Sequence, residues 1–62
     1  MRYYSTQRPI VPGSVPAYGL QEVHNFDLRT YCPEIDRYAW GWAEYDRILS
    51  DDETKGYELI PE

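Results

Sequence analysis

Asp36-Arg37-Tyr38-Ala39-Trp40-Gly41-Trp42-Ala43-Glu44-Tyr45-Asp46 is the stretch of sequence that decides the fold, because large and small side chains alternate along it. Successive side chains of a strand point to opposite faces, so one face carries the large residues Tyr38, Trp40, Trp42 and Glu44. The other face carries Ala39, Gly41, Ala43 and Tyr45. Small residues allow a close approach, and we expect a helix to pack over them.

The aromatic face of this strand has two interpretations. It is either a plain hydrophobic core or a surface that meets a protein partner or a second copy of the chain. The second interpretation rests on the prominence of Trp, Tyr and Arg in the energetic centres of protein interfaces.

Further strands are expected on both sides of this central one. Residues 2–7 are rich in β-forming side chains, residues 20–26 alternate between two faces, and residues 57–60 form a terminal strand that ends at Pro61. Residues 27–33 are compatible with a turn or with a short helical turn. The sequence therefore predicts three to four short strands.

A proline-rich loop connects the first two expected strands. Residues 8–19 contain three prolines, which interrupt regular hydrogen bonding and favour extended backbone before each one. Pro12-Gly13 suits the two central positions of a type II turn. Since apolar residues are interspersed with the prolines, we expect this loop to lie against the sheet.

Residues 50–56 carry the clearest helix signal. Ser50 and Glu53 have the spacing of a capping box, Asp51 and Asp52 complement the positive end of the helix dipole, and Gly56 is expected to end the helix. The sequence thus predicts a single α+β domain over residues 1–62. It contains a small antiparallel sheet of three to four strands, with one short helix packed on one face.

The length makes the predicted core marginal. A chain of 62 residues buries only about 60% of the surface that its unfolded form exposes. Its single cysteine excludes an internal disulfide, whereas aromatic residues make up 16% of the chain. Aromatic packing, supplemented by homodimerisation, is therefore the expected source of stability.

Acidic residues are concentrated in the second half of the chain. The net charge is −5: residues 1–31 carry three arginines and two carboxylates, and residues 32–62 carry three cations and nine carboxylates. This balance opposes binding to nucleic-acid phosphates and suits a partner with a basic surface. It also fits simple solubility. The chain contains neither a secretory signal nor an apolar run of about 20 residues, so we expect a cytoplasmic protein without membrane contact.

No pattern in the sequence indicates catalysis. Cys32 and His24 are the only conceivable nucleophile and base, but the acidic neighbours of Cys32 should raise the pKa of its thiol, which favours a structural role. His24 is expected to bond a carboxylate. Asp51, Asp52 and Glu53 point in different directions on a helix and do not converge on a metal. We expect no catalytic residue, metal or cofactor.

Several segments together resemble a known family. They are Tyr3-Tyr4-Ser5-Thr6-Gln7-Arg8-Pro9, Pro12-Gly13, Glu22-Val23-His24-Asn25-Phe26-Asp27, Ala39-Trp40-Gly41 and Tyr57-Glu58-Leu59. The chain is similar to short stand-alone proteins of gut Firmicutes mobile elements and prophages. These are related to the C-terminal domain of the phage "defence against restriction A" protein. The resemblance covers nearly the whole chain and implies an accessory that counters host defence.

Three functions follow from these observations. The first is a non-enzymatic acidic module that binds a protein, for example as an inhibitor of a host defence nuclease. The second is an accessory that binds or nicks nucleic acid through the aromatic sheet face, and the third is a purely structural homodimer. Seven residues are the predicted contacts to a protein partner: Tyr38, Trp40, Trp42, Glu44, Asp51, Asp52 and Glu53.

Overall fold

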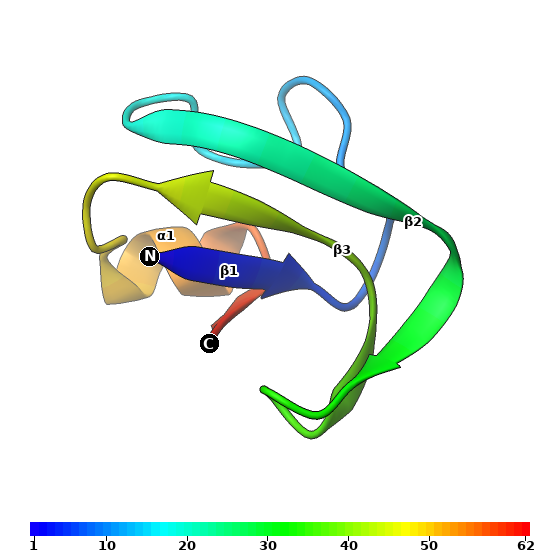
Figure 1. The fold of residues 1–62 in the computed structure, drawn as a ribbon. Helices are drawn as coiled ribbons and strands as arrows, with labels where there is room; N and C mark the ends of the chain where they lie inside the picture. The colour runs from blue at the N-terminus through cyan, green and yellow to red at the C-terminus, as the bar shows by residue number, and fades with distance from the viewer.

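A single antiparallel sheet organises the chain. The computed structural model describes residues 1–62, and its elements are β1 (Arg2–Ser5), β2 (Leu20–Cys32), β3 (Arg37–Tyr45), α1 (Asp51–Gly56) and β4 (Leu59–Pro61). The four strands lie in the order β2-β3-β1-β4, and every neighbouring pair is antiparallel (Figure 1). The predicted α+β class, with one sheet and one short helix, is confirmed.

β3 is a central strand, and its small residues face the core. Ala39, Gly41 and Ala43 are buried, whereas Tyr38 is exposed and Trp40 and Trp42 are only partly buried. The small residues therefore form the buried side of β3. The aromatic side is not a single plain hydrophobic core, because Tyr38 is exposed, but Trp42 packs against a second, smaller core cluster that contains Tyr4, Cys32 and Ala39.

The element that covers these small residues differs from the prediction. The largest buried cluster contains residues from β1, β3 and β4 together with residues from the connecting segments: Tyr3, Ile10, Val15, Ala43, Tyr45, Leu49 and Leu59. α1 contributes no buried residue, and among the strands its contacts are with β4. The cover over Ala43 is thus the proline-rich loop together with Leu49, which precedes the Ser50 N-cap of α1, so the expected helix cover is wrong. We call this side of the sheet the loop face, and the opposite side the Trp42 face.

Residues 8–19 lie against the sheet, as predicted. Ile10 and Val15 are buried, and the Asn25 side chain of β2 bonds both the N–H and the C=O of Ile10 at 2.8 Å. Ser14 N donates to Val11 O at 2.9 Å, and Gly13 has φ +88°. This is the backbone that a type II turn demands of its third residue, so the predicted turn is confirmed.

β2 is much longer than the predicted strand. It continues through residues 27–32, for which the sequence indicated a turn or helical turn. Between the pairs Asn25–Gly41 and Thr30–Ala39, β2 advances five residues while β3 advances two. Such a bulge bends a strand strongly, and Figure 1 shows β2 curving around one end of the sheet. The irregular pattern of residues 27–33 reflects this bulge.

The capping box of α1 is confirmed. Ser50 Oγ accepts from the N–H of Glu53 at 3.1 Å, and Glu53 Oε1 accepts from the N–H of Ser50 at 2.9 Å. The end of the helix differs from the prediction, because Gly56 is still helical and the left-handed residue is Glu58, with φ +57°. The last strand consequently begins at Leu59, two residues later than expected.

Two tyrosines anchor the loop face. The rings of Tyr3 and Tyr45 meet edge to face, with centroids 5.8 Å apart. The Tyr3 hydroxyl accepts from the N–H of Leu49 at 2.8 Å, and the Tyr45 hydroxyl donates to Pro16 O at 2.5 Å. Burial raises the pKa of Tyr45 to about 12. These bonds hold the loop and the segment before α1 onto the sheet.

Candidate interaction surface

Four charged side chains form a row across the Trp42 face. Strand pairing places Glu22 opposite Glu44, and Glu44 opposite Arg2. The N–H of Glu62 donates to Arg2 O at 3.0 Å, which continues the row beyond β1. Directly opposed residues of antiparallel strands lie on the same face. The row therefore reads Glu22, Glu44, Arg2, Glu62, and we call it the acidic row.

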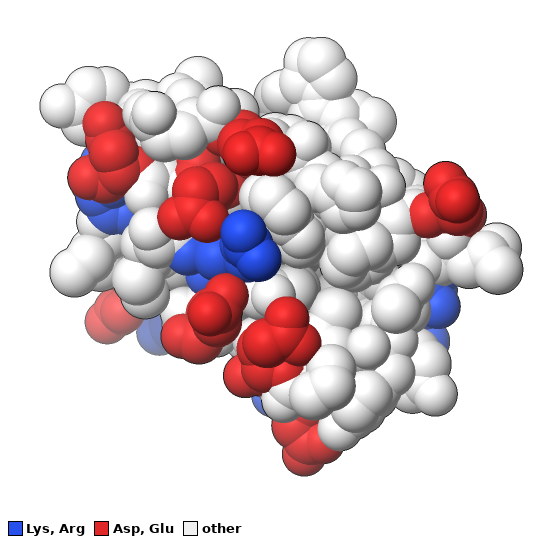
Figure 2. Space-filling model, in the orientation of Figure 1, with Lys and Arg blue, Asp and Glu red and all other residues white.

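Negative charge outweighs positive charge in this row. Arg2 Nε lies 3.2 Å from Glu44 Oε1, and the Met1 amino group lies 2.6 Å from Glu44 Oε2. The bond to the amino group is the main reason why the pKa of Glu44 lies below its ordinary value. Glu22 and Glu62 form no ion pair. Figure 2 shows the result on this face, where acidic groups surround a central basic patch.

An aromatic row runs beside the acidic row. Strand pairing aligns the rings of His24, Trp42 and Tyr4 across β2, β3 and β1, and aliphatic Ile60 of β4 ends the row. His24 stacks on Trp42 with ring centroids 5.5 Å apart, so the expected bond from His24 to a carboxylate is wrong. The Arg2 guanidinium carbon lies 3.8 Å from the centroid of the Trp42 ring. The indole is consequently held between a strand neighbour and a cation.

Tyr4 joins the aromatic row to a further carboxylate. Its ring is buried in a second small cluster with Cys32 and Ala39, and its hydroxyl donates to Glu34 Oε2 at 2.7 Å. Burial, followed by this bond to Glu34, raises the pKa of Tyr4 to about 12. A backbone hydrogen bond at Glu34 and the Tyr4 hydroxyl lower the pKa of the carboxyl. Glu34 thus adds negative charge at the hydroxyl of Tyr4, which is the strand neighbour of Trp42.

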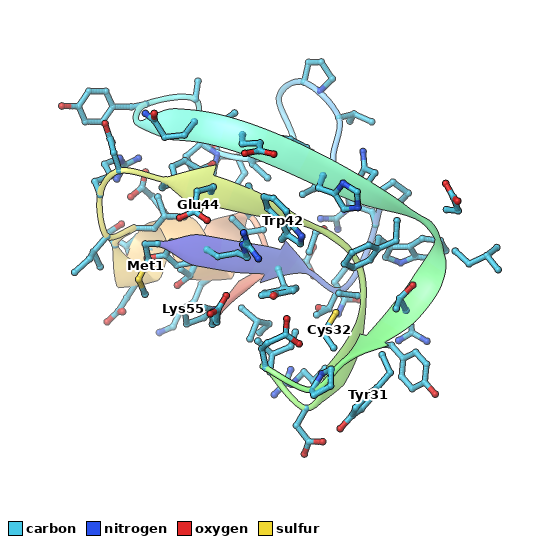
Figure 3. The ribbon with its side chains drawn as sticks, in the orientation of Figure 1. Met1, Tyr31, Cys32, Trp42, Glu44 and Lys55 are labelled. Carbon is cyan, nitrogen blue, oxygen red and sulfur yellow. The ribbon has the colours of Figure 1, made fainter.

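The predicted partner-binding residues do not form one surface. Trp42 and Glu44 point toward the viewer in Figure 3, whereas α1 lies behind β1 in Figure 1. Asp51 and Asp52 on α1 are exposed. Glu53 is occupied by its own contacts, because Arg47 binds both of its carboxylate oxygens, at 2.8 and 2.7 Å.

The remaining predicted aromatic residues lie farther along β3. Tyr38 is 51% exposed beside the β2–β3 turn, where its ring meets Tyr31 edge to face at 5.4 Å. The Arg29 guanidinium lies 5.3 Å from the Tyr38 ring centroid. Trp40 is partly buried. The predicted aromatic stripe is therefore divided between Trp42 at the centre of the sheet and Tyr38 at its end.

Cys32 has the features expected of a structural thiol. It is buried, and burial together with the nearby Glu34 raises the pKa of its thiol. No group of three or more His, Cys, Asp or Glu side chains is arranged to hold a metal ion. No helix in the structure has the length and apolar character needed to cross a membrane.

Comparison with known families agrees with the resemblance in the sequence. Residues 1–62 match the family described as Defence against restriction A C-terminal. The chain belongs to this family. Membership implies a phage anti-restriction context for the domain. No curated protein and no solved structure matches the chain.

In this Defence against restriction A C-terminal domain, sequence reasoning missed three members of the acidic row. Arg2, Glu22 and Glu62 are far apart in the chain and have no shared motif. Their only common signal is strand register, because each lies on the strand position that faces Glu44 or continues its row. The bulges and the sheet order that set this register cannot be read from composition or local alternation.

Sequence reasoning also missed an apolar groove. A cavity of about 420 Å³ lies between the proline-rich loop and β2. Eight residues line it, most of them apolar: Ile10, Val11, Pro12, Gly13, Val15, Ala17, Leu20 and Val23. The apolar residues among the prolines of the loop were its only sequence signal.

Proposed function

We propose that this chain is a non-enzymatic acidic interaction module that binds a basic surface on a protein. In the anti-restriction context of its family, that surface is the DNA-binding face of a host restriction nuclease. The acidic row beside Trp42 is the observation that carries the proposal. Binding there would exclude DNA from the nuclease without any chemical step.

The charge of the Trp42 face supports this choice of partner. Glu22 and Glu44 face each other directly across β2 and β3, and like charges in such positions are destabilising. Arg2 offsets only part of this charge, and Glu34 and Glu62 add to it. A cationic surface would relieve the repulsion, whereas nucleic-acid phosphates would increase it.

The setting of Trp42 supports recognition of a protein. Trp is enriched in the energetic centres of interfaces, surrounded by groups that exclude water. Here Arg2 and His24 fix the indole in place, so little conformational freedom remains to be lost on binding. A partly buried, fixed ring beside unpaired carboxylates provides one apolar contact and several charged ones.

Inhibition of DNA cleavage tests the proposal. A panel of purified restriction nucleases would be assayed on plasmid DNA with increasing amounts of the chain. The double change Glu34→Gln and Glu62→Gln should weaken inhibition strongly. The control Asp51→Asn and Asp52→Asn removes the same charge from α1 and should have little effect. Inhibition should also fall as salt rises, because salt screens exposed charges over about 8–10 Å.

Two outcomes would contradict this assignment. If the α1 double change abolishes inhibition and the Trp42-face change does not, the helix carries the binding surface. If the wild-type chain leaves every nuclease unaffected and binds none of them directly, the proposed partner class is wrong. Circular dichroism of each variant separates lost binding from lost folding.

A second candidate is nucleic-acid binding at the end of the β2–β3 hairpin. Tyr31 and Tyr38 are exposed there, with Arg29 beside Tyr38 and Arg37 at the start of β3. Exposed rings with arginines are the elements of a base-stacking platform. A mobility-shift titration with single-stranded DNA tests this. Salt-sensitive binding that is lost on changing Arg29 and Arg37 to alanine would favour the second candidate.

A further inference from the structure

One outer edge of the sheet is long and open. β2 is the first strand in the order β2-β3-β1-β4, so only one of its two edges is paired. It spans 13 residues, whereas β4 at the opposite edge spans three and ends at Pro61. An unpaired edge presents N–H and C=O groups that can pair with another strand. β2 is therefore the edge at which the sheet can grow.

Apolar surface accompanies this open edge. Val23 of β2 is 39% exposed, and Val11 in the loop beside it is 55% exposed. Both residues line the apolar groove between the loop and β2. A strand added to β2 would cover this surface, since its side chains on the loop face would lie over the groove.

The sequence of β2 is complementary to that of a second copy of β2 running antiparallel to it. With Val23 as centre, Val23 faces Val23 and Glu22 faces His24. These residues belong to the stretch that pairs with β3 without interruption. An apolar residue thus meets its own copy on the loop face, and a carboxylate meets an imidazole N–H donor on the Trp42 face. In an antiparallel pair the opposed side chains lie on the same face, close enough to interact.

We propose that two copies of this chain pair through β2, antiparallel, about a two-fold axis at Val23. Val23 of each copy meets Val23 of the other on the loop face. Glu22 of each copy accepts from His24 of the other on the Trp42 face, twice by symmetry. The two sheets then form one continuous sheet, with both acidic rows on the same side.

The bulges of β2 limit the possible registers. Residues 22–25 pair with β3 without interruption, and register shifts lie on both sides of them. An axis at Val23 falls within this regular stretch. An axis one residue earlier would place Glu22 opposite Glu22, and one residue later would place His24 opposite His24. Each of these registers loses the carboxylate–imidazole pairs, so the Val23 axis is favoured.

Disulfide crosslinking tests the axis directly. In a Cys32→Ala background, Val23→Cys places two thiols opposite each other across the axis, within the short distance that a disulfide needs. Under a glutathione redox buffer this variant should form a covalent dimer readily. The control Gln21→Cys, which faces residue 25 of the other copy, should crosslink much less. Equal crosslinking of the two variants would overturn the proposed register.

A charge exchange tests the pairing without a new thiol. Sedimentation equilibrium should show a dimer for the wild-type chain. Glu22→His alone and His24→Glu alone should each weaken it about tenfold, because both symmetric pairs become unfavourable. The double exchange restores opposite partners and should restore dimerisation. Circular dichroism would confirm that each variant remains folded.

The dimer does not depend on the proposed function, since these assays contain no nuclease. A wild-type chain that stays monomeric at millimolar concentration would overturn the inference and leave the acidic-row proposal standing. A dimer that is insensitive to both single changes, Glu22→His and His24→Glu, would also overturn it, because another surface would then form the contact.

Discussion

The two faces of the sheet are covered by different parts of this short chain and to different extents. On the loop face, Ala43 and Gly41 let other segments approach, and the cover consists of a proline-rich loop and Leu49. On the Trp42 face, Tyr4 is buried in a smaller cluster with Cys32 and Ala39, but Trp42 stays partly exposed. The polar neighbours of Trp42 are Arg2 and His24, with glutamates in the adjoining row.

This difference explains why Tyr38, Trp40 and Trp42, three large aromatic residues of β3, are not in the main core. A 62-residue chain has little material with which to cover two faces of a sheet. Small side chains on β3 bring the loop close enough for dense packing, and buried Tyr3 and Tyr45 fill the remaining space. The other face is left as a partly exposed aromatic and acidic surface, available for recognition.

Replacing one aromatic ring on each face by alanine should give the largest difference in stability between the two faces. Tyr3→Ala leaves a cavity in the loop face and removes the acceptor of the Leu49 N–H, so we expect a loss of about 3–5 kcal/mol in the free energy of unfolding. That would unfold most of the chain, given total stabilities of about 5–15 kcal/mol.

Trp42→Ala should cost clearly less, because its ring is already partly exposed. Urea unfolding followed by circular dichroism compares the two variants. An equal or larger loss for Trp42→Ala would mean that the Trp42 face is the main core after all.

The next prediction concerns the close approach of β2 to Gly41 of β3. A Cβ atom at Gly41 would lie 2.3 Å from the backbone oxygen of His24, so β2 and β3 must move apart to accept it. We expect Gly41→Ala to cost about 1–3 kcal/mol. The matched control is Gly56→Ala, where no atom lies within 4 Å and a helical alanine should stabilise by about 0.5–1 kcal/mol. Thermal unfolding that shows no cost for Gly41→Ala would contradict the close approach.

Acid should act only outside the loop-face core, because no carboxylate belongs to that cluster. Glu53 lies outside this cluster and accepts hydrogen bonds from Arg47 and from the backbone of Ser50. The bonds to Arg47, followed by the bond to Ser50, lower the pKa of the Glu53 carboxyl from the ordinary 4.5 to about 2. A carboxyl whose pKa is lower in the folded state stabilises above its unfolded pKa, and this contribution disappears as pH falls from about 4.5 to about 2. Glu53→Gln should therefore flatten the pH dependence of unfolding in this window.

Its control is Asp52→Asn, which removes an exposed carboxylate without an ion pair. A steep loss of stability in the same pH window that is unchanged in Glu53→Gln would assign the acid sensitivity elsewhere. The carboxyls of Glu34 and Glu44 on the Trp42 face, whose pKa values are also lowered, would then be responsible.

Local sequence determined the elements whose causes are local. The alternation along β3, the turn at Pro12-Gly13 and the capping box at Ser50 each depend on residues within a few positions of one another. All three were predictable from the sequence alone. The family resemblance also came from local segments, and the match over residues 1–62 confirms it.

Only the tertiary structure decided which face is buried, how β2 runs and where the charges meet. Alternation separates two faces but does not say what covers either of them, and here a loop provided the cover in place of the helix. The acidic row depends on strand order and on register, which bulges shift by several residues. These features arise from contacts between residues far apart in the chain, and a local pattern carries no information about such contacts.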